Sequence, residues 1–154
     1  QWEIFSKWAE KGQHYKKDLL FLVDEDTNAF NKIIDGFRMP KSTTEEIELR
    51  KAAIENATKY ATEIPFKVME TAYNSMEVMM AMAKEGIQNS LSDAGVGALC
   101  ARTAVVGAYF NVRINAKDIK DRSFAEEILS KAEEIYKKTN VLENKMIELI
   151  DSKI

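Results

Sequence analysis

The chain has 154 residues but only one cysteine, Cys100, and one histidine, His14. A single cysteine excludes an intramolecular disulfide framework and a zinc site built from clustered thiolates. Because thiolate and imidazole ligands are so few, we expect no metal cofactor. The scarcity of cysteine, together with an amino-terminal segment that has none of the features of a secretory signal, favours a reducing, cytoplasmic compartment.

Turn-forming residues are also scarce. The six glycines and two prolines make up about 5% of the chain, whereas roughly 12% is average. Few turn-formers predict few turns and long elements of secondary structure. An apolar share of 45% and a charged share of 31% are those of a globular protein, and the length suits a single domain over residues 1–154.

Long runs of one charge are absent. Lysine and arginine total 22 against 25 acidic residues, which gives a net charge of −3, and no basic run exceeds two residues. Such a chain has nothing built to neutralise a phosphate backbone, so we expect no nucleic-acid partner.

One apolar stretch approaches the length of a membrane span. Residues 94–112 contain a single charge, that of Arg102. The stretch is rich in glycine and alanine, and a charge at the middle of a bilayer is costly. We therefore predict a helix buried within the protein, and no membrane partner.

Apolar residues recur at intervals of three and four along the chain, and no segment alternates convincingly in the manner of a strand. This pattern predicts an all-α bundle of about five helices. The first is expected over residues 2–35, the second over 44–85 and the last over 123–152. The second is expected to be long and kinked at Pro65, or divided there into two nearly collinear helices.

Two sequence motifs mark expected helix starts. Thr43-x-x-Glu46 precedes the second helix, and Ser90-x-x-Asp93 follows a polar corner. Both have the pattern of a capping box, in which the hydroxyl and the acidic side chain each accept a hydrogen bond from a free backbone N–H.

Asp26 lies on an apolar stripe of the first predicted helix. At 100° per residue it falls between Leu22 and Phe30 at the centre of that stripe, whereas Asp24 points to the other side. An ionised carboxylate on an apolar face is costly unless it is paired, hydrogen-bonded or neutralised. Asp26 is therefore either a structural tie to a neighbouring helix or an acid/base whose pKa is raised by burial.

A later helix carries a face of small residues that ends in two amides, Asn111 and Asn115. Such a face permits close approach by another helix or by a second subunit. The two amides need partners if they are buried there. They either bond a neighbouring helix or bind the edge of a heterocycle with alternating donors and acceptors. The small residues are Gly97, Ala101, Ala104 and Ala108.

Residue type alone assigns three other polar side chains to the surface. His14 lies in a polar run and is expected to be solvated. Lys41 follows Pro40, and Arg50 lies in the first turns of the second helix, so both are expected to be solvated or ion-paired. The chain contains no Ser-His-Asp order, phosphate loop or metal motif.

Four motifs follow one another along the chain: Leu22-Val23-Asp24-Glu25-Asp26-Thr27-x-Ala29-Phe30, Met39-Pro40-Lys41, Asn89-Ser90-x-Ser92-Asp93-Ala94-Gly95-Val96 and Gly107-Ala108-Tyr109-Phe110-Asn111-Val112-x-Ile114-Asn115. Together they resemble the cyclodeaminase domain of formiminotransferase-cyclodeaminase, which also occurs alone as a methenyltetrahydrofolate cyclohydrolase-like protein. The resemblance implies an all-α, dimer-forming domain that acts on a tetrahydrofolate derivative without metal or nucleotide cofactor.

The resemblance also implies roles for individual residues. In that family the second aspartate of the Val-Asp-x-Asp motif is catalytic, which assigns this role to Asp26 and favours the acid/base reading. Basic residues near a helix start are expected to bind the glutamate carboxylates of a folate, because helix N-termini favour anions. The residues expected to bind substrate are Lys41, Arg50, Ser92, Asp93, Asn111 and Asn115.

The implied reaction is closure of 5-formiminotetrahydrofolate to 5,10-methenyltetrahydrofolate with loss of ammonia. The alternatives are a methenyltetrahydrofolate cyclohydrolase and a non-catalytic module for folate binding or helical assembly. The family usually begins with a Pro-Gly-Gly-Gly-type segment that nothing in this chain matches. We therefore expect an N-terminally truncated domain. The resemblance implies that this domain forms a homodimer or a larger homo-oligomer.

Overall fold

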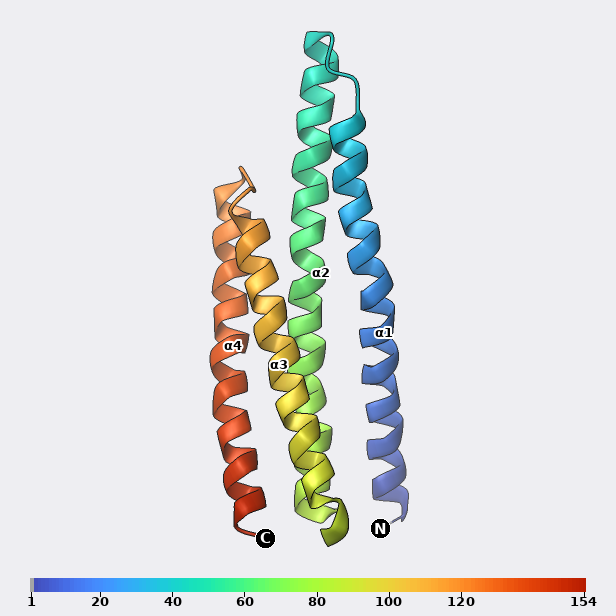
Figure 1. Cartoon of the computed structure of the whole chain (residues 1–154), viewed down its shortest axis with the longest axis vertical. Coiled ribbons are helices and arrows are strands. Elements are labelled where there is room, and N and C mark those ends of the chain that lie inside the picture. Colours follow the sequence, from blue (N-terminus) through green and yellow to red (C-terminus); the bar gives the residue numbers. More distant parts are fainter. Residues whose placement is uncertain (1) are drawn as a thin grey trace.

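The computed structural model describes residues 2–154 as an antiparallel bundle of four helices (Figure 1). No strand occurs among these residues, which confirms the all-α prediction. The expected count of about five helices is one too high, because the second helix is not divided at Pro65. The helices are α1 (Trp2–Arg38), α2 (Thr44–Glu85), α3 (Leu91–Ala116) and α4 (Arg122–Asp151), with a 3-10 turn at Gln88–Ser90 before α3.

The helix α2 continues through Pro65 because a side chain from α3 replaces the hydrogen bond that proline cannot make. Proline has no N–H, so the carbonyl of Ala61, four residues earlier, has no such partner within α2. The side-chain amide of Asn115 donates to that carbonyl at an Nδ2–O distance of 2.8 Å. Of the two readings of Asn115, the helix–helix hydrogen bond is therefore present.

This contact predicts a coupled effect on stability. We expect Asn115→Ala to lower the free energy of unfolding by about 1–3 kcal/mol, the cost of a buried carbonyl without a partner. In a Pro65→Ala background, the N–H restored at residue 65 can bond the Ala61 carbonyl, so the same change costs clearly less. Urea unfolding of the four proteins measures this coupling. Equal costs in the two backgrounds would contradict the assignment.

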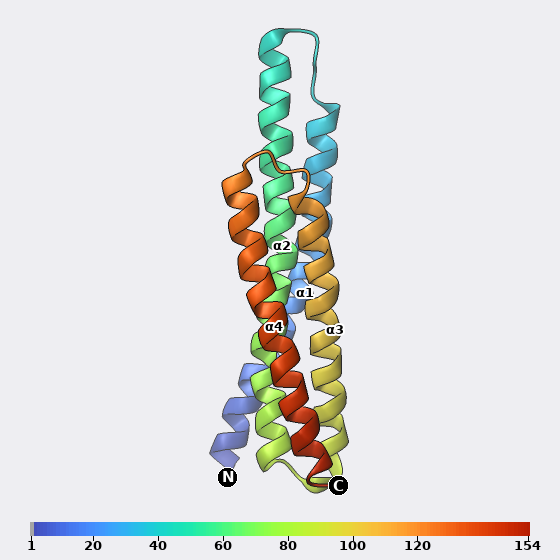
Figure 2. The ribbon, with the colours of Figure 1, turned by 90° about the vertical axis from the view of Figure 1, so that its left-hand side faces the viewer.

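The helices α1 and α2 are the longer pair, with 37 and 42 residues against 26 and 30 in α3 and α4. Their connected ends extend beyond the ends of the other two helices (Figures 1 and 2). The backbone of α1 lies close to α2 but not to α3 or α4. One long side of α1 therefore has no helix packed against it.

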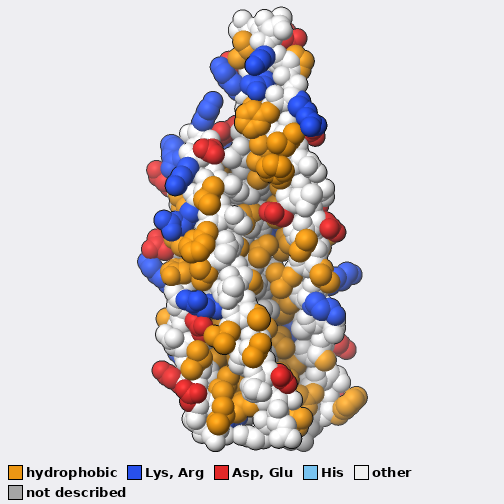
Figure 3. Space-filling view, in the orientation of Figure 1, with side chains coloured by type: hydrophobic (Ala, Val, Ile, Leu, Met, Phe, Trp, Pro, Cys, Tyr) orange, Lys and Arg blue, Asp and Glu red, His pale blue; other side chains and the backbone are white. Residues whose placement is uncertain are grey.

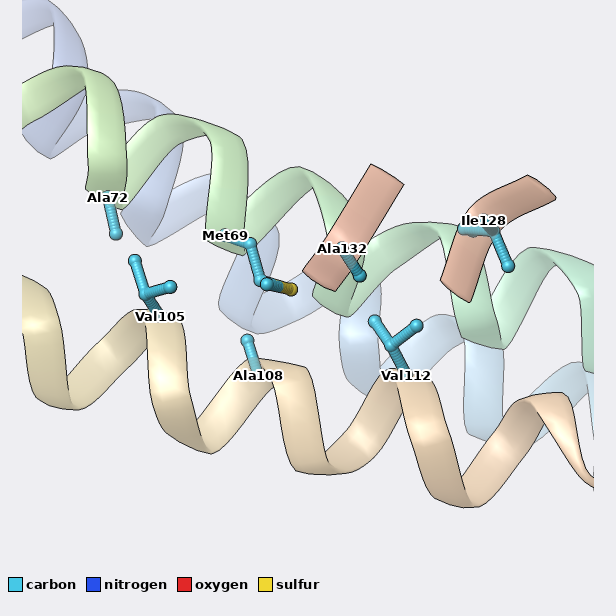
Figure 4. Packing of buried hydrophobic residues seen from close by; sticks show 7 residues of the cluster. All are labelled: Met69, Ala72, Val105, Ala108, Val112, Ile128 and Ala132. Atoms are coloured by element: carbon cyan, nitrogen blue, oxygen red, sulfur yellow. The ribbon is translucent and has the colours of Figure 1, made fainter. Parts of the chain in front are cut away.

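The main core lies where α2, α3 and α4 meet (Figure 4). Met69 of α2 and Val105 of α3 are completely inaccessible to solvent. Alanines such as Ala101 and Ala108 are buried where α3 meets α2, as the face of small residues predicted. The cluster consists of Met69, Ala72, Val105, Ala108, Val112, Ile128 and Ala132.

Only the first of the two predicted capping boxes is confirmed. The N–H of Glu46 donates to Thr43 Oγ1 at 3.2 Å, and Glu46 Oε2 accepts from the N–H of Thr43 at 3.1 Å. The second box is wrong, because Ser90 makes no side-chain cap. A 3-10 turn precedes α3 instead, with the Ser90 N–H bonded to the Ile87 carbonyl at 3.0 Å. The side chains of Ser90 and Asp93 consequently stay free of hydrogen bonds within residues 2–154.

The apolar stretch at residues 94–112 is buried on one side only, so the prediction of a buried helix is wrong for its outer side. Val105 and Val112 are fully buried, but Val96 and Phe110 are 60% and 53% exposed. Apolar side chains run down this side of the bundle (Figure 3).

Length and composition would allow one helix to cross a membrane. It spans Gln88–Ala116, and 28% of its most apolar 18-residue window is buried. The charge in this stretch is paired within the bundle, since Arg102 Nε lies 2.8 Å from Glu143 Oε2 on α4. The exposed apolar side of α3 is therefore a surface that a further partner can cover.

Candidate functional site on the α1–α3 face

Asp26 points toward the side of the bundle on which α1 and α3 flank α2, which we call the α1–α3 face. Leu19 packs on the core cluster formed by α2, α3 and α4, and Phe5 of α1 lines a pocket together with Ala94 and Gly97 of α3, so this side of α1 is turned toward α3. Asp26 follows Leu19 by seven residues, or two helical turns, and shares that side.

The predicted burial of Asp26 is wrong for a single chain, because its side chain is exposed. Leu22 is buried against α2, whereas Phe30 is 60% exposed, so α2 covers only one edge of the apolar stripe. Within residues 2–154 Asp26 makes no hydrogen bond and no ion pair. The structural-tie reading therefore has no support in the chain itself.

The carboxylate next to Asp26 in the sequence is held in place. The Tyr60 hydroxyl on α2 donates to Glu25, and Asn28 Nδ2 donates to it at 2.9 Å. These hydrogen bonds, that of Tyr60 above all, hold the pKa of Glu25 below its usual range, and the same bond raises the pKa of Tyr60. Lys32 Nζ lies 4.0 Å from the centre of the Tyr60 ring. Glu25 is thus an anion held by two hydrogen bonds, whereas the neighbouring Asp26 has no such partner within residues 2–154.

Two amides lie at the same height as Asp26 along the bundle. The Tyr60–Glu25 bond aligns α1 with α2 at this level, and the Asn115–Ala61 bond aligns α3 with it. Asn111 lies one turn before Asn115 and is exposed. The Asn115 amide nitrogen is occupied by the Ala61 carbonyl, so its Oδ1 and the whole amide of Asn111 are available to a ligand.

The two basic candidates lie at the end where α1 and α2 are connected. Arg50 is held by α1, since its Nη2 donates to the Phe37 carbonyl at 3.2 Å and its guanidinium lies 5.6 Å from the centre of the Phe37 ring. Lys41 is exposed and forms no ion pair within residues 2–154. The helical rise places this end about 20 Å from Asp26.

A pocket of about 510 Å³ lies at the opposite end, between the start of α1, the end of α2 and the start of α3. Among the described residues that line it, Asp93 is the only one with an ionisable side chain and Ser90 the only one with a hydroxyl. Gly97 allows α3 to pack closely on Met79 in the pocket wall, because a Cβ there would lie 3.1 Å from Met79 Cγ. Ser92, a predicted substrate ligand, is exposed and does not line the pocket. The lining residues are Phe5, Val78, Met79, Met82, Gly86, Ile87, Ser90, Asp93, Ala94 and Gly97.

The predicted site residues thus form three groups in one chain. Asp26 shares one height with the two asparagines, and the basic pair lies beyond it at the connected ends of α1 and α2. Ser92 and Asp93 lie at the other end. Asp93 precedes Asn115 by 22 residues on α3, which corresponds to about 33 Å along the axis. A single chain therefore keeps Asp26 and Asp93 far apart.

Sequence reasoning missed several residues of the pocket between the start of α1, the end of α2 and the start of α3. Phe5 was not among the predicted site residues, and Ser90 was assigned to a cap that does not form. Ser90 lines the pocket and Ser92 does not, because Ser90 ends the 3-10 turn whereas Ser92 lies in the first turn of α3. This difference depends on where α3 begins, which the sequence did not predict. Across residues 2–154 no three His, Cys, Asp or Glu side chains are grouped so that they could hold a metal ion.

These features define a class of protein: an all-α bundle with a free carboxylate on an open apolar face and two amides at its height. The sequence model of the Formiminotransferase-cyclodeaminase family matches residues 1–134. The chain belongs to the formiminotransferase-cyclodeaminase family.

Relatives and a solved structure agree with this assignment. The chain is 32% identical over 145 residues to a methenyltetrahydrofolate cyclohydrolase of Methylorubrum extorquens, covering 94% of this chain and 70% of that protein. It is 39% identical over 110 residues to a formimidoyltransferase-cyclodeaminase of Gallus gallus, covering 71% of this chain but 20% of that protein. A crystal structure of formiminotetrahydrofolate cyclodeaminase from Thermotoga maritima shares the fold, with a TM-score of 0.77 and 22% identity, over 91% of this chain and 66% of that one.

Proposed function

We propose that this chain closes 5-formiminotetrahydrofolate to 5,10-methenyltetrahydrofolate and releases ammonia, with Asp26 as the acid/base. The observation that carries the proposal is the free carboxylate of Asp26 on the α1–α3 face, in a chain that belongs to this family. Asn111 and the Asn115 Oδ1 lie at about the same height, and we propose that they bond the folate there.

The reaction needs one group that moves a proton in two steps. The folate N10 attacks the carbon of the protonated formimino group and forms a tetrahedral intermediate that bridges N5 and N10. The Asp26 carboxylate accepts the N10 proton and then gives it to the departing nitrogen, which leaves as ammonia. The positive charge of the substrate stays on the N5–C–N10 unit of the product. A single carboxylate can serve as base and then acid when its pKa lies near the working pH.

Burial is one means of raising the pKa of a carboxyl group, and one chain does not bury Asp26. We propose that the substrate or a second subunit covers it. Ring closure is intramolecular, so holding the folate in its reactive conformer supplies much of the acceleration.

The assay follows the methenyl product from 5-formiminotetrahydrofolate. We expect turnover with release of one ammonia per product. Binding of the folate without turnover of either the formimino or the methenyl substrate would leave the non-catalytic folate-binding module as the function. Absence of both binding and turnover would favour the assembly module.

A methenyltetrahydrofolate cyclohydrolase is the second candidate. It is favoured by the 32% identity to the cyclohydrolase of Methylorubrum extorquens, of which this chain covers 70%. Water attacks the methenyl carbon in that reaction, and Asp26 would take its proton and return one to the folate nitrogen that leaves the ring. Comparing kcat/KM for the formimino and methenyl substrates separates the two candidates.

We propose that Lys41 binds the glutamate tail of the substrate. Its distance from Asp26, about 20 Å by helical rise, matches an extended folate whose reacting atoms lie at Asp26. We expect Lys41→Ala to raise KM for a polyglutamylated substrate more than it lowers kcat, because tail binding is the same in the ground and transition states. A Lys16→Ala variant, on an exposed part of α1 nearer its start, serves as the control. An unchanged KM in Lys41→Ala would exclude this role.

We also propose that the chain forms a homodimer through the α1–α3 face. The accessible surface of the chain is 9812 Å², which is about 1,900 Å² more than the roughly 7,900 Å² typical of a compact monomer of this mass. The elongated shape and the exposed apolar side of α3 account for the excess. A stable protein interface needs about 800 Å² per subunit, so this excess is sufficient.

A further inference from the structure

The pocket beside Asp93 has the chemistry of a site for a flat heterocycle. Phe5, Met79 and Met82 offer it apolar and polarizable contacts, which suit the faces of an aromatic-like ring. Its single carboxylate, on Asp93, has no partner within residues 2–154. The volume of about 510 Å³ lies within the range for small-molecule sites.

One part of a folate fits this pocket better than the rest. The pterin ring carries an amino group and a ring N–H side by side, and both are donors. A carboxylate has two acceptor oxygens and can bond both donors at once, as it does with the fork of an arginine. The benzoyl and glutamate parts present no such pair of donors.

A pterin in this pocket would be too far from Asp26 of its own chain. The two carboxylates are separated by about 33 Å along the bundle. The atoms that react, N5 and N10, belong to the pterin ring or lie one carbon beyond it. The site is therefore incomplete in one chain.

A second copy of the chain can bring its Asp26 close to Asp93 of the first. The exposed apolar residues of α3 run from Val96 to Ile114 and are centred near residue 105. A two-fold axis that crosses α3 at that point packs this stripe against itself in antiparallel orientation. Residue 93 of one copy then lies within about one helical turn of residue 115 of the other, which is the height of Asp26.

The centre of this interface suits close packing. Gly107 lies on the outer side of α3, and a Cβ added there would meet no atom within 4 Å. In the antiparallel arrangement the large Phe110 of one copy lies at about the height of the exposed Cys100 of the other. A large side chain opposite a small one allows the two faces to interdigitate.

We propose that each active site is shared between two subunits: the pocket of one subunit holds the pterin ring on Asp93, and the second subunit supplies Asp26. The inference rests on the proposed function and names the part of the folate and the pairing of residues that this function needs. The two sites of the dimer are equivalent, and each uses both chains.

Heterodimers with a different tag on each subunit test the pairing. A dimer of an Asp26→Asn subunit with an Asp93→Asn subunit contains one site in which both carboxylates are intact. We expect it to show about half of the wild-type kcat per dimer, while each homodimeric variant is at least tenfold less active. A dimer of a wild-type subunit with a subunit carrying both changes has no intact site and is expected to be inactive. The opposite pattern, activity only in this second heterodimer, would assign the whole site to one chain and overturn the proposal.

Binding separates failure of the pocket from failure of the proposed reaction. The probe is 5-formyltetrahydrofolate, titrated into the wild-type protein, Asp93→Asn and the control Asp151→Asn, a carboxylate at the same end of the bundle. We expect Asp93→Asn to weaken binding by about 10- to 100-fold, the loss expected for hydrogen bonds to a charged group. The control is expected to bind as the wild type does. Unchanged affinity in Asp93→Asn would refute the pterin pocket even if the enzyme turns over, whereas lost affinity in a protein without turnover would keep the pocket and reject the reaction.

Discussion

Replacing Asp26 with asparagine is expected to lower kcat by roughly 10²–10⁴-fold while the fold is kept, the range typical for loss of a general acid/base. Asparagine keeps the volume of the side chain but cannot accept and return a proton. The side chain of Asp26 is exposed and makes no contact with a charged or hydrogen-bonding partner within residues 2–154, so its loss should barely change the melting temperature.

Asp24→Asn is the matched control. It is also an exposed carboxylate on α1, but it lies two residues away and thus about 200° around the helix. We expect its kcat within a few-fold of the wild type. Measuring kcat and the melting temperature of both variants distinguishes the two readings of Asp26. An Asp26→Asn protein that is destabilised, but whose folded fraction turns over normally, would instead support a structural role for Asp26.

The second large effect is expected when the apolar stripe of α3 is interrupted. Phe110 is 53% exposed and Ile114 is 60% exposed. Placing a carboxylate at the centre of an apolar interface buries a charge without a partner, which costs several kcal/mol. We expect Phe110→Asp to yield a monomer in light scattering and to lose at least a hundredfold in kcat/KM, because Asp26 then stays uncovered.

The same substitution outside the proposed interface provides the control. Phe21 is 62% exposed on α1, but it lies about 100° to one side of Leu22 and away from the α1–α3 face, whereas Val23 lies about 100° to the other side. Phe21→Asp should remain dimeric and active. Because Phe110 is exposed in the single chain, Phe110→Asp should keep its helical circular dichroism. A dimeric, fully active Phe110→Asp protein would place the interface elsewhere.

The local chemistry of the sequence was sufficient for the helices and for one helix start. Intervals of three and four between apolar residues follow from the helical repeat itself, and they predicted an all-α chain with ends within a few residues of those observed. The capping box at Thr43 also formed, because both of its hydrogen bonds join residues three positions apart. The failed box at Ser90 shows the limit, since a 3-10 turn there satisfies the backbone in another way.

Burial was decided by the tertiary structure. The sequence pattern places Leu22, Asp26 and Phe30 on one stripe of α1. It contains no information on how much of that stripe a neighbouring helix buries. In the bundle only α2 lies along α1, so Leu22 is buried while Asp26 and Phe30 are exposed. The apolar stretch of α3 was misjudged for the same reason, because an apolar helix can be covered by its own chain or by another one.

The sequence by itself determined the candidate residues for the chemistry: the motif containing Asp26, the two asparagines that end the small-residue face, and Asp93 after the polar corner. Only the tertiary structure decided how they are distributed. The continuous α2, kept intact at Pro65 by Asn115, sets a rigid spacing along the bundle. That spacing keeps Asp26 and Asp93 about 33 Å apart in one chain, because each residue of a helix advances the axis by a fixed 1.5 Å.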